Sequence, residues 1–212
     1  MTVMNQKSTT NPCETIRVLK LIGTYSHSNE FIHTLQADKS LLIDAVYLLR
    51  MVHESGKSNP DHMFGTVKSI TEVGNTEKME SDPVFGFKRD LIRLIGNLCH
   101  EKRENQDQVL LLYVIHHFRI IRFFKNYEYV YFTRSIFCIF IQVREINGIE
   151  LILDCSPIDG KNPYISQWVI FAIRNICLGN QENQAVLNSV SKTGTTDKQM
   201  LEEIGVQIQG MS

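Results

Sequence analysis

The stretches LIGNLCHEKRENQDQV (residues 94–109) and AIRNICLGNQENQAVL (residues 172–187) are two copies of one pattern. Identical residues recur 78 positions apart in the two copies: Asn97 and Asn175, Cys99 and Cys177, and the tripeptides 104–106 and 182–184, both Glu-Asn-Gln. Apolar residues recur at spacings of three and four through residues 87–98, which is typical of a helix with one buried face. A repeated helical pattern indicates a solenoid, in which each repeat packs against the next.

Residues 109–142 separate the two copies and differ in composition from the rest of the chain. They contain 10 of the chain's 19 aromatic residues and a single acid, Glu128. Without these 34 residues the copies lie 44 positions apart, within the roughly 40 to 47 residues of armadillo and HEAT repeats. Their removal also joins Gln108 to Val143 in continuous repeat-like sequence, ENQDQVREINGIELILDC. We therefore interpret residues 109–142 as an insertion that is foreign to the repeat.

The origin of the insertion has more than one explanation. It begins with Val, whose codons start with GT, and ends with Gln, one of whose codons ends in AG, so a retained in-frame intron is one explanation. A genuine lineage-specific loop or buried helix is another. A membrane-spanning helix is disfavoured because four basic residues interrupt the roughly 18 apolar residues that such a span needs. These are Arg119, Arg122, Lys125 and Arg134.

The remaining sequence predicts an all-α fold, a right-handed armadillo-like solenoid fragment over residues 14–188. Helices are predicted in the ranges 14–53, 86–99, 104–109, 149–154 and 162–179, with Gly56 ending one helix and Pro163 in the first turn of another. A short, a middle and a long helix in each repeat favour armadillo over the two-helix HEAT plan. Residues 1–13 are predicted to be disordered, 57–83 a flexible loop, and 189–212 a tail whose apolar end closes the last repeat.

Composition excludes several classes of protein. The formal net charge is −1, and the repeat region offers no basic stripe of the kind that binds nucleic acid. The five cysteines are scattered, with no CxxC motif and no histidine at ligand spacing, which favours a reducing compartment and no metal site. The N-terminus lacks an apolar segment of signal-peptide length. We therefore expect a cytoplasmic protein without cofactor.

The sequence also lacks the common catalytic patterns. There is no Gly-rich phosphate loop, no HExxH and no GxSxG, so we predict a protein that is not an enzyme. A hydrolase or transferase on a helical fold is the weaker alternative. A membrane-associated protein that uses the aromatic and basic insertion as an interfacial anchor is another alternative.

Asn97 and Asn175 are the candidate protein-binding residues. In armadillo proteins of the importin-alpha type, an asparagine near the end of each long helix binds the main chain of an extended peptide. An aromatic residue often lies four positions earlier, and here Phe171 precedes Asn175 while Arg93 precedes Asn97. The alternative is that both asparagines bond to neighbouring backbone or face solvent. Trp168 is expected to be buried between adjacent repeats.

Longer segments carry a resemblance to a known family. GFKRDLIRLIGNLCHEKRENQDQV (residues 86–109), continued by REINGIELILDCSPIDGKNPYISQWVIFAIRNICLGNQENQAV (residues 144–186), resembles the C-terminal armadillo-type domain of the ataxin-10 family. LIDAVYLLRMVHESGK (residues 42–57) is similar to the preceding segment of that family, and NPYISQWVIFAIRN is the most specific part.

The resemblance implies a cytoplasmic, non-enzymatic scaffold associated with neuronal survival, neurite outgrowth and cytokinesis. Its partners are then other proteins, and a homo-oligomer is an open possibility. The sequence departs from the family in two ways: it carries the insertion, and it starts without the N-terminal repeats of the family. We therefore expect a partial or mis-spliced product, with loss of function as an alternative outcome.

Overall fold

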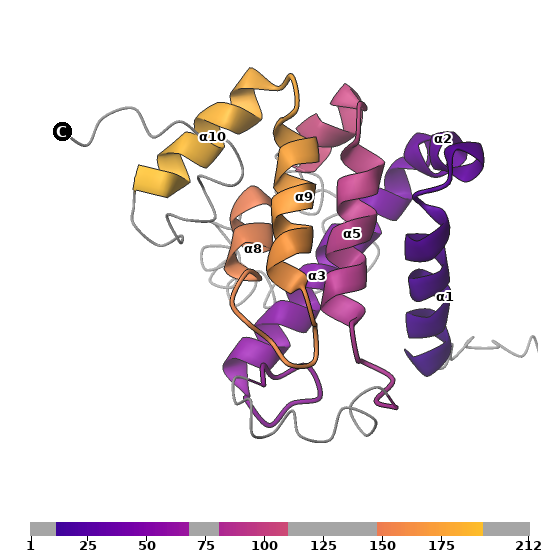
Figure 1. Cartoon of the computed structure of the whole chain (residues 1–212), viewed down its shortest axis with the longest axis vertical. Helices are drawn as coiled ribbons and strands as arrows, with labels where there is room; N and C mark the ends of the chain where they lie inside the picture. Colours follow the sequence, from indigo (N-terminus) through magenta and orange to yellow (C-terminus); the bar gives the residue numbers. More distant parts are fainter. Residues whose placement is uncertain (1–11, 68–80, 110–147, 193–212) are drawn as a thin grey trace, which may run out of the picture.

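The computed structural model describes residues 12–67, 81–109 and 148–192 (Figure 1). These ranges contain helices and no strand, so the all-α prediction is confirmed. Residues 103–109 are also helical. The other helices are α1 (Pro12–Tyr25), α2 (Asn29–Ala37), α3 (Lys39–Ser58), α5 (Phe87–Cys99), α8 (Gly148–Asp154), α9 (Ile165–Cys177) and α10 (Gln181–Lys192).

The helices form two layers. Helices α1, α5 and α9 lie side by side in one layer, while α3 packs behind α5 and α8 packs against α9 (Figure 1). The core lies between the layers, and each fully buried Leu or Ile side chain there contributes roughly 1.5–3 kcal/mol. Its members include Leu42, Leu49, Leu94, Ile95, Ile152 and Ile173.

The 78-residue repeat of the sequence is also a repeat of the backbone. Helices α5 and α9 both contain 13 residues. Each follows a residue in the left-handed conformation, Gly86 (φ 73°) and Tyr164 (φ 62°). A second left-handed residue follows each helix, Glu101 (φ 51°) and Gly179 (φ 66°). The internal repeat predicted from the sequence is therefore present in the structure.

The start of α9 differs from the prediction. Pro163 was expected in the first helical turn, but α9 begins two residues later, at Ile165. Asn162 explains the difference, because its side chain is used in the loop: Nδ2 donates to Asp159 Oδ2 (2.8 Å) and Oδ1 accepts from the Arg89 amide (3.2 Å). Residues 159–163 therefore form a turn that docks on the start of α5.

Gly56 does not end α3, which continues to Ser58. A side chain at Gly56 would collide with the backbone carbonyl of Phe64. The glycine therefore permits the turn at residues 60–65 to pack on the last part of the helix. Residues 57–67 were predicted as part of a flexible loop, yet Val67 bonds to residues of another loop, with its N–H donating to Asp159 Oδ1 (3.2 Å) and its carbonyl accepting from Gly160 (2.8 Å).

Several predicted segments lie wholly or mostly outside the described residues. These are the N-terminal residues 1–11, the middle of the loop at 68–80, the insertion beyond Val109, and the tail from 193 to 212. Val109 itself is buried, and α10 extends past the predicted domain end at 188. Among the described helices, none has the length and apolar character that crossing a membrane requires.

Candidate functional site

Asn97 and Asn175 occupy equivalent places near the ends of α5 and α9, and each is only 8% exposed. Asn175 Nδ2 donates to the carbonyl of Gly96 in α5, the neighbouring helix of the same layer (3.1 Å). Asn97 Nδ2 donates to Ser26 Oγ (2.8 Å), and that hydroxyl donates to the carbonyl of Gly23 (2.8 Å). Each asparagine therefore joins the end of its own helix to a carbonyl near the end of the helix before it.

These contacts bear on the hypothesis that the two asparagines bind a peptide. The amide N–H groups of both side chains already have partners within the protein, and His100 Nδ1 lies 3.3 Å from Asn175 Oδ1. A peptide would have to replace these bonds, and a buried polar group left without a partner costs about 1–3 kcal/mol. The arrangement of Asn175 agrees with the alternative, bonding to neighbouring backbone. Peptide binding by these residues stays a prediction.

A second set of amides, which the sequence analysis did not single out, also links consecutive repeats. Gln36 Nε2 donates to the carbonyls of Asn97 (3.2 Å) and His100 (2.8 Å), just as Gln106 donates one repeat later to those of Asn175 (2.9 Å) and Leu178 (3.2 Å). The last carbonyls of a helix have no partner within the helix, so these glutamines satisfy them. The repeated Glu-Asn-Gln tripeptide was the signal for Gln106, whereas Gln36 follows Thr-Leu and had no such signal in the sequence.

The asparagine of that tripeptide completes the link. Asn105 Nδ2 donates to the carbonyls of Gln36 (3.1 Å) and Leu98 (2.8 Å). Asn183 Nδ2 makes the same two bonds one repeat later, to Gln106 (3.1 Å) and Ile176 (2.9 Å). We call this set of Asn and Gln side chains (Gln36, Asn105, Gln106 and Asn183) the amide ladder. It shows that the repeated sequence stacks the repeats on one another.

Arg93 and Phe171 lie together on the outer side of α5 and α9. The Arg93 guanidinium carbon lies 5.5 Å from the centre of the Trp168 ring. Trp168 meets Phe171 edge to face, with 5.5 Å between ring centres and an interplanar angle of 82°. Trp168 packs against the core but is only partly buried, so the expectation that it is buried between repeats is met in part: one side of its ring lies under Arg93 of α5. We call Arg93, Trp168 and Phe171 the aromatic–arginine cluster.

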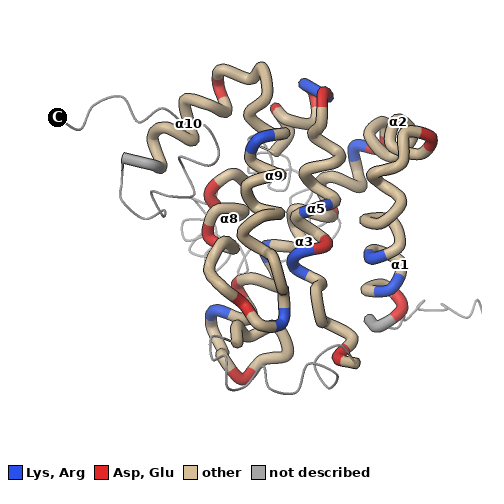
Figure 2. The backbone as a smooth tube through the Cα atoms, viewed as in Figure 1, with Lys and Arg blue, Asp and Glu red and all other residues tan. Residues whose placement is uncertain are grey.

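Gly96 explains why this cluster can form. A side chain at Gly96 would lie within 3.0 Å of both the Ala172 Cα and the Phe171 ring. The glycine therefore lets α5 and α9 approach closely, with the Phe171 ring covering the gap. Figure 2 shows Lys, Arg, Asp and Glu positions spread over several helices and loops.

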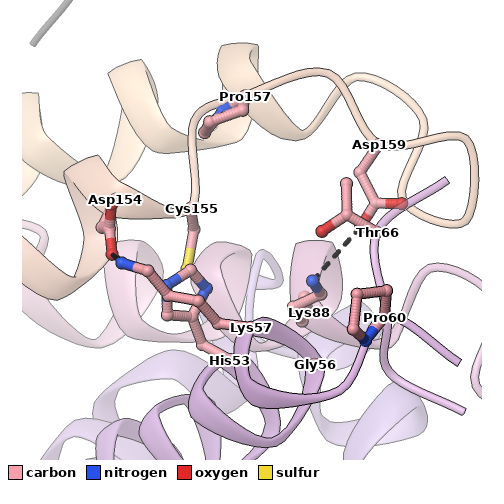
Figure 3. A pocket seen from close by; sticks show the side chains of 10 residues that line it. All are labelled: His53, Gly56, Lys57, Pro60, Thr66, Lys88, Asp154, Cys155, Pro157 and Asp159. Carbon is pink, nitrogen blue, oxygen red and sulfur yellow. Dashed lines mark hydrogen bonds and ion pairs between the residues drawn. The ribbon is translucent and has the colours of Figure 1, made fainter. Parts of the chain in front are cut away.

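A cavity of about 260 Å³ lies between α3, α5 and the loop after α8 (Figure 3). Lys88 and Asp159 form an ion pair at its edge (3.2 Å), and their side chains are 7% and 3% exposed. The cavity is lined by His53, Gly56, Lys57, Pro60, Thr66, Lys88, Asp154, Cys155, Pro157 and Asp159.

Three residues of the cavity form a connected chain. His53 Nε2 lies 2.9 Å from Asp154 Oδ2, and His53 Nδ1 lies 3.4 Å from Cys155 Sγ. Partial burial raises the pKa of Asp154, but hydrogen bonds from Lys57 (2.8 Å) and His53 lower it by more, so its pKa lies below the ordinary 3.8. Burial raises the pKa of the Cys155 thiol to about 12. The carboxylate is therefore ionised and the thiol protonated at neutral pH.

The other described cysteines have no such neighbours. Burial raises the pKa of Cys177 to about 12 and that of Cys99 further still. Within the described ranges, no three His, Cys, Asp or Glu side chains are grouped so that they could hold a metal ion.

Comparison with known proteins agrees with the resemblance seen in the sequence. A family profile described as Spinocerebellar ataxia type 10 protein domain matches residues 120–212. Ataxin-10 of Xenopus tropicalis is 31% identical to the chain over 199 residues, covering 92% of the chain and 32% of the relative. Ataxin-10 of Homo sapiens is 30% identical over 195 residues, covering 92% and 33%. The chain belongs to the ataxin-10 family.

The family membership confirms the resemblance. The aligned region, however, covers only part of each relative. The chain spans about a third of the length of the curated ataxin-10 proteins that it matches. The Ataxin-10 homolog of Dictyostelium discoideum is 31% identical over 141 residues, which are 66% of the chain and 17% of that protein. No solved structure matches the chain. The activity and partners of a whole ataxin-10 protein are therefore proposals for this chain.

Proposed function

We propose that this ataxin-10 family chain is a non-enzymatic scaffold that binds other proteins through armadillo-like repeats. The helix order supports the repeat assignment, because two units each contain three helices: a short one, a second one, and one that lies in the layer formed by α1, α5 and α9. The first unit is α2, α3 and α5, and the second is residues 103–109, α8 and α9. The amide ladder supports it as well, since the same bonds recur between consecutive units.

The observation that carries the proposal is the aromatic–arginine cluster on the surface of α5 and α9. Tryptophan and arginine are the residues most enriched among those that dominate binding energy in protein interfaces. Here Trp168 and Phe171 are partly buried and keep part of their surface exposed, and Arg93 is held against the Trp168 ring. The Phe171 ring packs over Gly96, and Trp168 packs edge to face on Phe171 and under Arg93, so these side chains are already partly ordered and have less freedom to lose on binding.

The test is a quantitative pull-down with the full chain as bait. The double variant Trp168→Ala/Phe171→Ala should reduce recovery of specific partners at least about tenfold, since a dominant interface residue contributes about 2 kcal/mol or more. Ile158→Ala is the matched control, because Ile158 is 82% exposed but lies away from the cluster. Equal recovery by all three proteins would remove the cluster as the binding surface.

The peptide-binding hypothesis for Asn97 and Asn175 makes a different demand. If both asparagines bind an extended partner with Arg93 and Phe171, replacing both by Ala should weaken binding and leave the melting temperature nearly unchanged. If they only join repeats, the same variant should melt lower and keep its partners. Thermal melts and pull-downs of this variant therefore separate the two roles.

If the chain forms a homo-oligomer, we propose that the contact surface lies on α1. Val18, Leu21 and Tyr25 recur at spacings of three and four and are 53%, 57% and 55% exposed. An apolar stripe of this kind favours association with a second copy. Leu21→Glu should shift sedimentation of the chain toward the monomer if self-association uses this stripe.

From the family resemblance we also propose a cytoplasmic location and roles in neuronal survival, neurite outgrowth and cytokinesis. Expression of the chain in cells depleted of their own ataxin-10 tests these roles. Restored division would support them, while persistent multinucleate cells at normal expression would count against them.

A further inference from the structure

Cys155 differs from the other described cysteines in what surrounds it. Cys155 and Cys177 are equally buried, at 5% and 7% exposed, and their thiols have the same raised pKa of about 12. Cys155 lines this cavity, which Cys99 and Cys177 do not, and of these three sulfurs only that of Cys155 lies within hydrogen-bond distance of a histidine (Figure 3). Cys155 and Cys177 can therefore be compared within one protein, because they are similarly buried but have different neighbouring side chains.

The hydrogen bonds around His53 decide what the imidazole can do. The ionised Asp154 carboxylate has no proton to give, so the 2.9 Å contact requires that His53 Nε2 carry a hydrogen and donate it. In the neutral ring, Nδ1 then has a free lone pair, and it lies 3.4 Å from Cys155 Sγ. A nucleophile, a base within hydrogen-bond reach and a third group that orients the base form the arrangement that activates weak nucleophiles.

We infer that Cys155 is a modification site for small sulfur electrophiles, with His53 as the general base and Asp154 as the residue that positions it. This inference is independent of the proposed scaffold function, because it concerns one covalent step and no turnover. The cavity volume of about 260 Å³ equals that of several water molecules, each of which occupies about 30 Å³ in the liquid. It therefore admits a reagent of a few heavy atoms and excludes a folded protein.

The proposed reaction can be written for methyl methanethiosulfonate, the reagent used as the probe. Cys155 Sγ attacks the sulfenyl sulfur of the reagent, and a new S–S bond forms as the S–SO₂ bond breaks. Methanesulfinate leaves with the bonding electron pair. The thiol proton passes to His53 Nδ1 and from there to water. A small natural disulfide would react in the same way and release one thiol.

The base is necessary for this reaction at neutral pH. With a thiol pKa of about 12, roughly one Cys155 side chain in 100,000 is ionised at pH 7 without help. A positioned base typically contributes about 10²- to 10⁴-fold. Any excess of the Cys155 rate over the Cys177 rate should therefore depend on His53 and, through it, on Asp154.

The test is a time course of the folded, full-length chain with the reagent at pH 7, stopped with acid and read by peptide mass spectrometry at each cysteine. Cys155 should react at least about tenfold faster than Cys177, and His53→Gln should remove that excess without changing the Cys177 rate. Cys13 and Cys138 are mapped separately and do not enter the ratio. In denaturing urea the two rates should become equal.

A second variant protects the test against misfolding. Asp154→Asn retains the shape of a side chain that is 51% exposed, and it should lower the Cys155 rate while leaving the melting temperature close to that of the parent chain. Equal rates at Cys155 and Cys177 in the folded chain would overturn the inference. A Cys155 rate that is unchanged in both variants would overturn it as well, because the thiol would then react through local opening.

Discussion

Helices α5 and α9 occupy the same place in consecutive repeats, and they share their buried apolar residues but differ at several polar and surface positions. Their buried apolar residues match in kind, and both helices end in a buried asparagine and cysteine, Asn97 and Cys99 in one and Asn175 and Cys177 in the other. On the outer side, Arg93 stands where α9 has Phe171. The difference teaches that the shared residues stack the repeats, while the changed residues give each repeat its own surface.

The largest effect should come from a position at which the two repeats differ in the interior. Lys88 is buried in an ion pair with Asp159, whereas the equivalent Ser166 is half-buried. Lys88→Ala should cost about 3–5 kcal/mol of unfolding free energy, because it leaves the buried Asp159 carboxylate without its positively charged partner. Ser166→Ala should change it by less than about 0.5 kcal/mol. Urea denaturation of both variants measures the contrast, and equal losses would contradict it.

Substitutions in the amide ladder should behave in the opposite way: equivalent changes in the two repeats should lower the unfolding free energy by equal amounts. Asn105→Ala and Asn183→Ala each remove two hydrogen bonds to equivalent carbonyls, so each should cost about 2 kcal/mol at about 1 kcal/mol for each bond. Chemical denaturation of the two variants side by side is the measurement. A loss at one position and none at the other would mean that the matching bonds do not contribute equally to stacking.

Trp168→Ala should have a smaller effect, about 1–2 kcal/mol, because the ring is only partly buried against the core and loses, besides that packing, one edge-to-face contact and one contact with Arg93. A fully enclosed tryptophan would instead cost about 3–5 kcal/mol. Denaturant melts distinguish these ranges, and Phe171→Ala in the same background tests whether the rings act together. A loss of unfolding free energy in the higher range would indicate that the Trp168 ring is fully enclosed in the core.

The smallest effect should appear in acid. The pKa of Asp154 is lower in the folded chain than its ordinary 3.8, so its contribution to stability is present above pH 3.8 and is lost as the pH falls through the folded pKa. Asp154→Asn should therefore make stability less dependent on pH in this acid range. Melts between about pH 2.5 and pH 5 would show it. Parallel curves for parent and variant would indicate that the contacts with Lys57 and His53 do not persist in solution.

Local sequence pattern was sufficient for most helices. The stripe from Phe87 to Leu98 predicted α5, and the short run before Asp154 predicted α8, because apolar periodicity reports which face of a helix is buried. The helix boundaries were less predictable. The ends at Gly56 and Pro163 were wrong, since Gly56 is required by a close contact with another segment and Pro163 belongs to a turn held by Asn162.

The candidate site was predictable only in part. The spacing placed Arg93 and Phe171 four residues before the two asparagines, but it could not show that both amides would be used between repeats. It also gave no sign that His53 would meet Cys155, because these residues lie 102 positions apart and belong to different segments.

The sequence by itself determined that this protein is all-α, that its helices repeat, and that it belongs with the ataxin-10 family, because periodicity, repeated tripeptides and family motifs are local features of the chain. The tertiary structure alone decided which amides satisfy which helix ends, that Trp168 is only partly buried, and which cysteine lies beside a histidine. Each of these depends on the packing of helices that are distant in the chain. Packing fixes burial and hydrogen-bond partners through close approach in space, which spacing along the sequence does not specify.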